Sequence, residues 1–317
     1  MNILVVGAGA VGTFLGERFA AVGAGVTFAP RELDAVHPGA YELAIVAVKS
    51  YDTDGAIATL RRAALSPETT ILTVQNGIGN EERLIEAFGN DRVIAGALTI
   101  PVERDASGKV RATARGGIGL APCGSGSHNW LSAACEHAGI AVATYRDYRA
   151  LKWSKLVLNI LANAQCAILD ILPDELMRIS GGFTRERLAL RESLAVMRAQ
   201  GIAPVDLPEY RVRTLELIAS FPEAVARTIL ASRLARSRGG KAPSLLHDVR
   251  AGNRRTEIAS LNGAVAQAAQ RFGVKAPVNA AFSRLIDEIV ADSARREVYR
   301  RNPKALEAAI NGAVRSK

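Results

Sequence analysis

The first twelve residues of the chain contain a short apolar run, a glycine-rich turn and the start of a helical pattern. Residues 2–6 are β-prone, and Gly7-Ala8-Gly9-Ala10-Val11-Gly12 separates them from a helical pattern over 13–22. In this arrangement the first glycine permits a tight turn, the second lets backbone amides approach a phosphate, and the third lets the helix pack on the strand. A phosphate there also faces the positive end of the helix dipole. The pattern predicts a strand, turn and helix that bind a dinucleotide.

The first half of the chain continues to alternate between strand and helix, as a parallel sheet requires. After Pro101 the pattern changes to a hairpin between 102 and 122, with its turn at residues 105–108, and a short strand over 140–144. From Tyr148 onward the chain reads as helical. We predict an α/β fold class, with an N-terminal Rossmann-type doubly wound sheet over 1–150 and an all-helical domain over 151–317. The earlier strands are expected at 2–6, 25–29, 43–48, 69–74 and 92–97, and the helices at 13–22, 53–64 and 80–88.

Composition is consistent with two folded domains and excludes several classes of protein. The chain has 317 residues, 49% of them hydrophobic and 22% charged, which is enough for two cores. No apolar run approaches the roughly 20 residues that span a membrane, and residues 1–12 lack the features of a signal peptide. The three cysteines are too scattered for a disulfide framework or a zinc site. We expect a cytoplasmic protein without a structural metal and with reduced cysteines.

The net charge of +9 is divided unevenly along the chain. Residues 1–149 carry a net charge of −2 and residues 150–317 one of +11. The basic residues are spaced along helices together with acidic ones, aromatic residues make up only 5% of the chain, and no nucleic-acid-binding motif is present. We therefore expect no nucleic-acid partner, and a positive second half that attracts an anionic substrate and cofactor.

The residues after the second strand bear on the choice of dinucleotide. The strand ends in Ala29-Pro30-Arg31-Glu32. An arginine at this point suits the 2′-phosphate of NADP through bidentate hydrogen bonds, whereas an acidic residue suits the ribose hydroxyls of NAD. Arg31 favours NADP, and Glu32 keeps NAD as the alternative.

Residues 151–163 predict an apolar helix with one polar line through Lys155, Asn159 and Asn163. Steps of four residues place these side chains on one face, where an ammonium and two carboxamides would be costly to bury without partners. A polar ligand is the simplest partner. The alternative is the solvated face of an amphipathic helix, although such faces are usually rich in Glu and Lys.

Polar groups also follow the third and fourth strands, where ligands of parallel sheets collect. The third strand ends in Lys49-Ser50 and the fourth in Gln75-Asn76-Gly77-Ile78-Gly79. Asn-Gly is also a common turn pair, so Asn76 has an ordinary structural explanation too. Further along, Glu257 is expected in the first turns of a long helix, where a capping or salt-bridge role would be ordinary.

Together these blocks resemble the ketopantoate reductases, the 2-dehydropantoate 2-reductases, over nearly the whole chain. The resemblance implies an NADPH-dependent enzyme that reduces ketopantoate to pantoate on the pathway to pantothenate and coenzyme A. It rests on Gly7 to Gly12, Arg31, Ala47-Val48-Lys49, Gln75 to Gly79, the Lys155/Asn159/Asn163 helix, Ser244 with Asp248, Thr256-Glu257-Ile258 and Asn262-Gly263.

The resemblance also implies roles for individual residues. Lys155 matches the proton donor, which would stabilise negative charge on the ketone oxygen and then protonate it. Glu257 matches an acidic residue beside the reacting centre. Lys152 is a rival donor, expected to be more solvated at the mouth of the helix. The remaining matches are Asn159, Asn163 and Ser244 for the substrate, Asn76 for substrate and cofactor, and Arg31, Lys49 and Val102 for the cofactor.

Two alternatives remain beside ketopantoate reduction. One is an NADP-dependent reductase of another small 2-oxo acid, because Asn163 is followed by Ala-Gln-Cys where relatives commonly have Pro, an apolar residue and Thr. The other is a catalytically silent dinucleotide-binding sensor, which would have no need of Lys155, Asn76, Ser244 and Glu257 together. The oligomeric state stays open, with a homodimer as one expected assembly.

Overall fold

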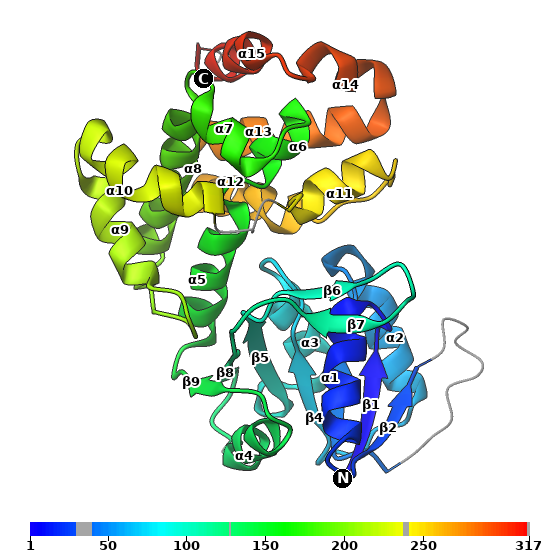
Figure 1. The fold of residues 1–317 in the computed structure, drawn as a ribbon. Helices are drawn as coiled ribbons and strands as arrows, with labels where there is room; N and C mark the ends of the chain where they lie inside the picture. Colours follow the sequence, from blue (N-terminus) through cyan, green and yellow to red (C-terminus); the bar gives the residue numbers. More distant parts are fainter. Residues whose placement is uncertain (30–39, 127, 237–240, 316–317) are drawn as a thin grey trace. The chain divides into compact units, whose positions relative to one another are not determined.

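The computed structural model describes residues 1–29, 40–126, 128–236 and 241–315, which form two compact units. The first unit comprises Met1–Lys155 and the segment Asp206–Tyr210, and the second comprises Leu156–Val205 and Arg211–Lys317. Figure 1 shows a sheet with flanking helices in the first unit, and the described part of the second unit is built from helices. This confirms the predicted fold class, a Rossmann-type sheet followed by a helical region.

In its described residues, the first unit alternates between strands and helices and includes the short 3₁₀ helices η2 and η3. Its elements are β1 (Asn2–Val6), α1 (Ala10–Ala20), β2 (Gly25–Phe28), β3 (Leu43–Val46), η2 (Ser50–Asp52), α2 (Thr53–Arg62), β4 (Thr70–Thr73), α3 (Asn80–Phe88), η3 (Asn90–Arg92), β5 (Val93–Leu98), β6 (Val102–Arg104), β7 (Val110–Ala112), β8 (Ile118–Pro122), α4 (Asn129–His137) and β9 (Val142–Thr144).

Helix α5 (Tyr148–Ile160) begins in the first unit and ends in the second. The elements after it are α6 (Ala164–Leu169), α7 (Pro173–Arg178), α8 (Gly182–Ala199), α9 (Val212–Ser220), α10 (Glu223–Arg236), α11 (Ser244–Arg250), the 3₁₀ helix η4 (Ile258–Ser260), α12 (Asn262–Arg271), α13 (Pro277–Ala291), α14 (Ser293–Tyr299) and α15 (Pro303–Arg315).

The main sheet has seven strands in the order β2-β1-β3-β4-β5-β8-β9. The pairs from β2 to β5 are parallel, β8 is antiparallel to β5, and β9 is parallel to β8. The strand order reverses at β1, and ligands of such sheets bind at the carboxyl ends of the strands beside the reversal. The glycine turn after β1 and the residues after β3 occupy this position.

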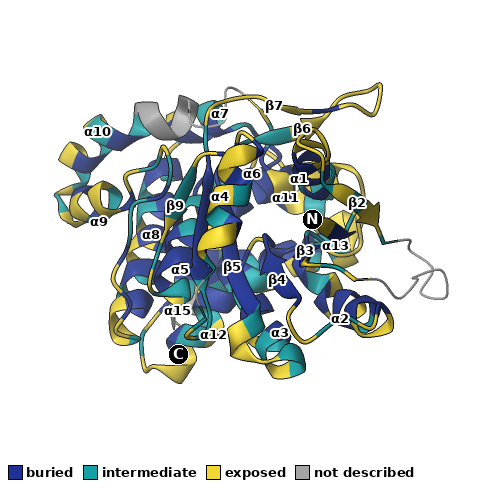
Figure 2. Cartoon of the chain, turned by 90° about the horizontal axis from the view of Figure 1, so that it is seen from below, coloured by how far each residue is buried: buried dark blue, intermediate teal, exposed yellow. Residues whose placement is uncertain are grey.

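The central strands of the sheet are buried on both faces, as Figure 2 shows for β3, β4 and β5. In β1, Ile3 and Val5 pack with α1 and α4, whereas Leu4 and Val6 pack with α2 and α3. Neighbouring residues of a strand point to opposite faces, so a strand with helices on both faces is apolar at every position. This explains why residues 3–6 form a continuous apolar run.

The hairpin after Pro101 is shorter than the sequence predicted. Strands β6 and β7 pair antiparallel, and Asp105 Oδ1 accepts hydrogen bonds from the N–H groups of Ser107 and Lys109 at 2.9 and 3.0 Å. The chain from Ile118 onward instead joins the main sheet as β8. Both strands of the hairpin pack on α1, which brings them close to the glycine turn.

The boundary between the units lies inside α5, after Lys155, whereas the sequence placed it near residue 150. The chain returns to the first unit at Asp206–Tyr210, where the Tyr145 hydroxyl donates a hydrogen bond to the Asp206 carbonyl oxygen at 2.7 Å. Helix α5 is continuous across residues 150 and 155, so the sequence pattern contains no signal for the boundary between the two units.

Helix α13 is central to the second unit, where it packs against α6, α8, α12, α14 and α15. Its Phe282, Leu285 and Ile286 are fully buried. Within the described ranges of the chain, none of the helices has the length and apolar character needed to cross a membrane.

Asp170 connects three segments of the second unit through arginines. It ends α6 in the left-handed conformation, with φ of 53°. Its carboxylate oxygens lie 2.6 Å from Arg250 Nε, 3.2 Å from Arg296 Nη2 and 3.3 Å from Arg300 Nε. Burial alone would raise the pKa of Asp170, but Arg250 and Arg296 hold this pKa below its ordinary value. The ionised carboxylate therefore stabilises the unit.

We expect Asp170→Asn to lower the free energy of unfolding by about 1–3 kcal/mol near neutral pH, because Asn tolerates the left-handed backbone but loses the charge-assisted bonds. The folded-state pKa lies below the unfolded value, so this contribution is present above about pH 4 and is lost as pH falls through the folded-state pKa. Urea denaturation of both proteins from neutral pH down to about pH 3 checks this. A stability difference that stays constant over that range would contradict it.

Candidate active site

The glycine turn after β1 has the geometry that its sequence predicted. Gly7 has φ of 110°, and a Cβ on it would lie 2.8 Å from the carbonyl carbon of Ala47. A Cβ on Gly12 would lie 1.9 Å from the Gly7 carbonyl oxygen, whereas a Cβ on Gly9 would meet nothing within 4 Å. The fold therefore requires glycine at positions 7 and 12, and the open space at Gly9 is accessible to a ligand.

The same turn presents the amino end of α1. Gly9 caps the helix without a side-chain hydrogen bond, and the first turn contains no acidic residue. Ala8 and Gly9 are exposed, and Ala10 and Val11 are half-buried. Backbone N–H groups and the helix dipole at such an end suit a phosphate. Residues 7–12 therefore fit the pyrophosphate of a dinucleotide.

Arg104, which the sequence analysis did not single out, extends from β6 to this turn. Its Nη2 donates to the Ala8 carbonyl oxygen and to Thr13 Oγ1, both at 3.0 Å. Its Nη1 donates to the Gly108 carbonyl oxygen at 2.7 Å. The hairpin was the one signal for this residue in the sequence, and it did not show that β6 packs on α1.

Lys49, Val102 and Arg31 are further residues that we expected to contact the cofactor. Lys49 is half-buried after β3 and caps the amino end of η2. Val102 is the half-buried first residue of β6. Arg31 and Glu32 lie outside the described residues, so the choice between NADP and NAD stays a prediction.

Asn76 is exposed on the turn between β4 and α3, while its neighbours Gln75 and Gly77 are buried. Asn80 Nδ2 donates to the Asn76 carbonyl oxygen at 3.0 Å. Gly77 and Gly79 adopt φ of 86° and 98°, which glycine tolerates without strain. The turn thus has a fixed backbone and one exposed carboxamide.

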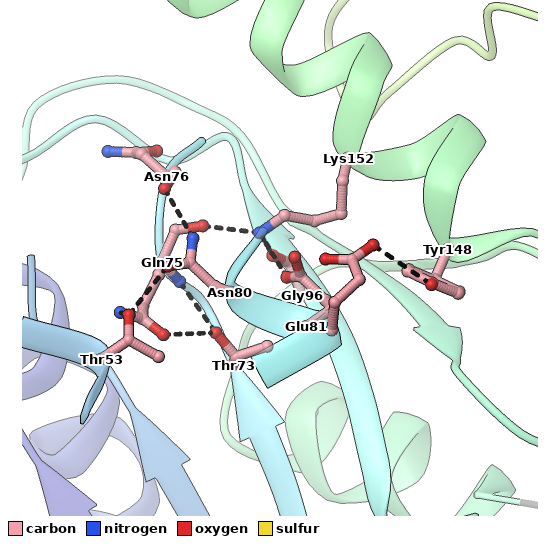
Figure 3. Close-up of polar contacts among 10 residues, drawn as sticks. Thr53, Thr73, Gln75, Asn76, Asn80, Glu81, Gly96, Tyr148 and Lys152 are labelled. Atoms are coloured by element: carbon pink, nitrogen blue, oxygen red, sulfur yellow. Dashed lines mark hydrogen bonds and ion pairs between the residues drawn. The ribbon is translucent and has the colours of Figure 1, made fainter. Parts of the chain in front are cut away.

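Lys152 forms a buried ion pair with Glu81, and Figure 3 shows this group. The two side chains are 3% and 1% exposed, and Lys152 Nζ lies 2.9 Å from Glu81 Oε1. Nζ also donates to the carbonyl oxygens of Gln75 at 2.6 Å and Gly96 at 3.3 Å. Burial raises the pKa of Glu81, although Lys152 acts in the opposite sense.

The expectation of a solvated Lys152 at the mouth of the helix is therefore wrong. Its acceptors come from α3, from the turn after β4 and from β5, which are distant in the sequence. The ammonium donates two hydrogen bonds to buried main-chain carbonyl oxygens and faces the Glu81 carboxylate as an ion pair.

Lys155 lies one turn further along α5 and is half-buried, as is Asn159. The predicted helix over 151–163 begins and ends three residues too late, because α5 spans Tyr148–Ile160 and Ala162 adopts a left-handed φ of 49°. Asn163 caps the amino end of α6 instead. The polar line on the helix therefore consists of Lys155 and Asn159.

Glu186 holds the turn between α5 and α6. Its carboxylate accepts hydrogen bonds from the Ala162 N–H at 2.7 Å and from Gln165 Nε2 at 2.8 Å. Gln165 Oε1 accepts from Arg185 Nε at 2.5 Å. The left-handed backbone costs a non-glycine residue on the order of 1 kcal/mol, which these buried bonds offset. Gln165 is thus part of the support for this turn.

The turn places Asn163 beside the start of α11. Asn163 Oδ1 accepts from the Leu245 N–H at 3.1 Å, and Nδ2 donates to the Asn159 carbonyl oxygen at 3.0 Å. Nδ2 also lies 3.4 Å from Ser244 Oγ. Asn163 is buried and Ser244 is exposed. The structure thus brings together Asn159, Asn163 and Ser244, through a chain reversal rather than along one helix.

Glu257 is 4% exposed and directly precedes η4. Its carbonyl oxygen accepts hydrogen bonds from the N–H and Oγ of Ser260, at 3.0 and 2.9 Å. The expected place in the first turns of a long helix is wrong, because that helix, α12, begins at Asn262. The 3₁₀ helix η4 lies between Glu257 and α12. The sequence pattern did not distinguish this short helix from the first turn of α12.

Two family models match the chain. The model described as "Ketopantoate reductase PanE/ApbA" matches residues 29–124. The model described as "Ketopantoate reductase PanE/ApbA C terminal" matches residues 147–290.

Individual relatives agree with these models. The 2-dehydropantoate 2-reductase of Pyrobaculum aerophilum is 30% identical over 242 residues, which are 76% of this chain and 75% of the relative. The crystal structure of a PanE/ApbA family ketopantoate reductase from Ralstonia eutropha JMP134 has a TM-score of 0.74 at 25% identity and covers 92% of this chain and 100% of its own. D-mandelate dehydrogenase in complex with NADH has a TM-score of 0.75 at 19% identity, over 92% and 99% of the two chains, and so shares the fold.

We expect Lys152→Ala to lower the free energy of unfolding by about 3–5 kcal/mol, because it leaves the Glu81 carboxylate buried without a counter-charge. Lys155→Ala on the same helix is the matched control, with an expected loss below about 1 kcal/mol because that side chain is half-buried. Guanidinium chloride denaturation of the two variants near neutral pH compares them. Equal losses would show that the buried pair is not the stabilising contact described.

Proposed function

Because this chain belongs to the ketopantoate reductase family, a family of oxidoreductases, we propose that it reduces 2-dehydropantoate to pantoate with NADPH. The reaction would serve the synthesis of pantothenate and coenzyme A in the cytoplasm. The observation that carries the proposal is the contrast between two lysines of α5. Lys152 is enclosed by the Glu81 carboxylate and two carbonyl oxygens, while Lys155 is half-buried in the helix that also carries Asn159.

The residues around the glycine turn support the proposed cofactor site. The backbone at 7–12 would hold the pyrophosphate, and the open space at Gly9 leaves room for it. The guanidinium of Arg104 adds a positive charge at this turn. Arg31 would contact the 2′-phosphate that distinguishes NADPH from NADH. Lys49, Asn76 and Val102 are the further residues proposed to contact the cofactor.

In the proposed reaction the cofactor supplies a hydride to the ketone carbon. Negative charge then develops on the ketone oxygen, where the Lys155 ammonium would stabilise it and donate a proton. Lys152 would have to leave its buried acceptors to do the same. Glu257 is proposed as the acidic residue beside the reacting centre, in keeping with its burial.

Asn159, Asn163 and Ser244 are proposed to bind the substrate. They already adjoin one another around the turn that ends α5. Carboxamide and hydroxyl groups pair with the carboxylate and the hydroxyl group of a hydroxylated 2-oxo acid. Asn76, exposed on a fixed turn, is proposed to contact both substrate and cofactor.

A different small 2-oxo acid is the second candidate substrate. The observation in its favour is the buried group of Gln165, Glu186 and Arg185, which supports the turn that carries Asn163. The sequence resemblance led us to expect Pro, an apolar residue and Thr after Asn163, in place of Ala-Gln-Cys. NADPH oxidation against a panel of 2-oxo acids separates the candidates. The highest kcat/KM for 2-dehydropantoate supports the first, and a higher value for another acid supports the second.

We expect Lys155→Ala to lower kcat by at least about 100-fold, the usual scale for losing a general acid. NADPH affinity should change much less, because the glycine turn is untouched. Steady-state kinetics, together with fluorescence titration of NADPH, measures both quantities. Near-normal turnover in this variant would rule out Lys155 as the proton donor.

We expect NADPH to bind at least about tenfold more tightly than NADH, a difference of roughly 1.4 kcal/mol. Arg31→Ala should reduce this preference without changing the stability of the fold, since it removes the partner of the 2′-phosphate. Calorimetric titration of the two proteins with each cofactor tests the expectation. Equal affinity of the wild type for both cofactors would contradict it.

A further inference from the structure

One ammonium group joins four elements of the first unit. Lys152 projects from α5, and its acceptors lie in α3, after β4 and in β5, as Figure 3 shows. We propose that Lys152, paired with Glu81, is a positioning residue that holds the turn at Gln75 and Asn76 for the reaction. The inference rests on the proposed function and extends it to a residue without a proposed contact to substrate or cofactor.

A core built for stability alone does not need this pair. Removing two charges from water costs several kcal/mol for each ion, and apolar residues of similar volume are often as stable or more stable at such positions. An apolar side chain would fill the same space. It would provide no donor for the carbonyl oxygens of Gln75 and Gly96, which Lys152 contacts at 2.6 and 3.3 Å. The ammonium therefore contributes directed bonds to the main chain.

Those bonds complete the fixation of the turn that carries Asn76. Lys152 holds the Gln75 carbonyl oxygen, and Asn80 holds that of Asn76. The Gln75 side chain is also fixed, because its Nε2 donates to Thr53 Oγ1 at 2.9 Å and its Oε1 accepts from Thr73 Oγ1 at 3.1 Å. The Asn76 side chain remains exposed.

The hydrogen bond from Lys152 to the Gln75 carbonyl oxygen comes from a different part of the unit than the other bonds of this turn. It comes from α5, the helix that carries Lys155, whereas Asn80, Thr53 and Thr73 belong to the sheet and its own helices. Lys152 and Lys155 lie one turn apart on α5. The bonds of Lys152 hold α5 against the sheet, and the position of the helix sets the direction in which Lys155 leaves it. The ion pair thus couples the proposed proton donor to the proposed substrate contact Asn76.

The test replaces the whole pair, because Lys152→Ala alone leaves a buried charge and endangers folding. We would compare wild type, Lys152→Met/Glu81→Leu, Asn76→Ala and the triple variant. Each is assayed for kcat and KM with 2-dehydropantoate, for NADPH affinity by fluorescence and for thermal stability. Asp170→Asn, which is destabilised in the second unit, controls for loss of stability alone.

We expect Lys152→Met/Glu81→Leu to keep its fold and to lose about tenfold or more in kcat/KM, while Asp170→Asn keeps wild-type kinetics. The triple variant should lose less kcat/KM than the product of the two separate losses, because part of the effect of the pair passes through Asn76. A loss in the triple variant equal to the product of the two separate losses would overturn the positioning role. Wild-type kinetics in Lys152→Met/Glu81→Leu would also overturn it.

A wild type that oxidises NADPH with none of the 2-oxo acids would overturn the proposed function but not this inference. The wild type, the double variant, Asn76→Ala and the triple variant are then compared for NADPH affinity, which Asn76 is also proposed to affect. Non-additive losses of affinity between Asn76→Ala and the apolar pair support the positioning role. Additive losses, or no loss in the double variant, contradict it.

Discussion

The carboxyl edge of the sheet depends on how one buried ammonium group is satisfied. An ammonium in the interior is tolerated when acceptors surround it, and those of Lys152 come from three other elements. The buried ammonium therefore fixes the positions of Glu81 and of the Gln75 and Gly96 carbonyl groups, and these groups fix the position of Lys152. Because one of these acceptors adjoins Asn76 and the lysine lies one turn before Lys155, the same constraint acts on the residues proposed to carry the chemistry.

The second unit uses buried charges in a similar way, at the places where the chain reverses. Glu186 holds the left-handed Ala162 between α5 and α6, and so determines where Asn163 lies. Asp170 ends α6 in the same conformation and binds arginines of α11 and α14. In both units, charged groups with directed bonds fix the turns, while apolar residues fill the layers between them.

What could be predicted from the sequence were the features with a local signal. The glycine spacing and the apolar runs predicted the turn after β1 and the order of strands and helices, because strand and helix periodicity and the sterics of glycine act within a few residues. The Lys152 pair was missed because its partners are far apart in the sequence. The end of α5 at Ile160 was missed because Ala162 is a good helix former whose left-handed conformation is imposed by Glu186. Arg104 was missed for the same reason as Lys152, since its partners lie in another element.

We propose that the two lysines of α5 divide their roles, with Lys152 holding the turn at Asn76 and Lys155 at the reacting ketone. A crystal structure of the protein with NADP and 2-dehydropantoate tests this most directly, through the distances from each Nζ to the ketone oxygen. We expect Lys155 Nζ within about 3.2 Å of that oxygen, with Lys152 still paired with Glu81. Lys152 at the ketone oxygen, with Lys155 directed elsewhere, would contradict it.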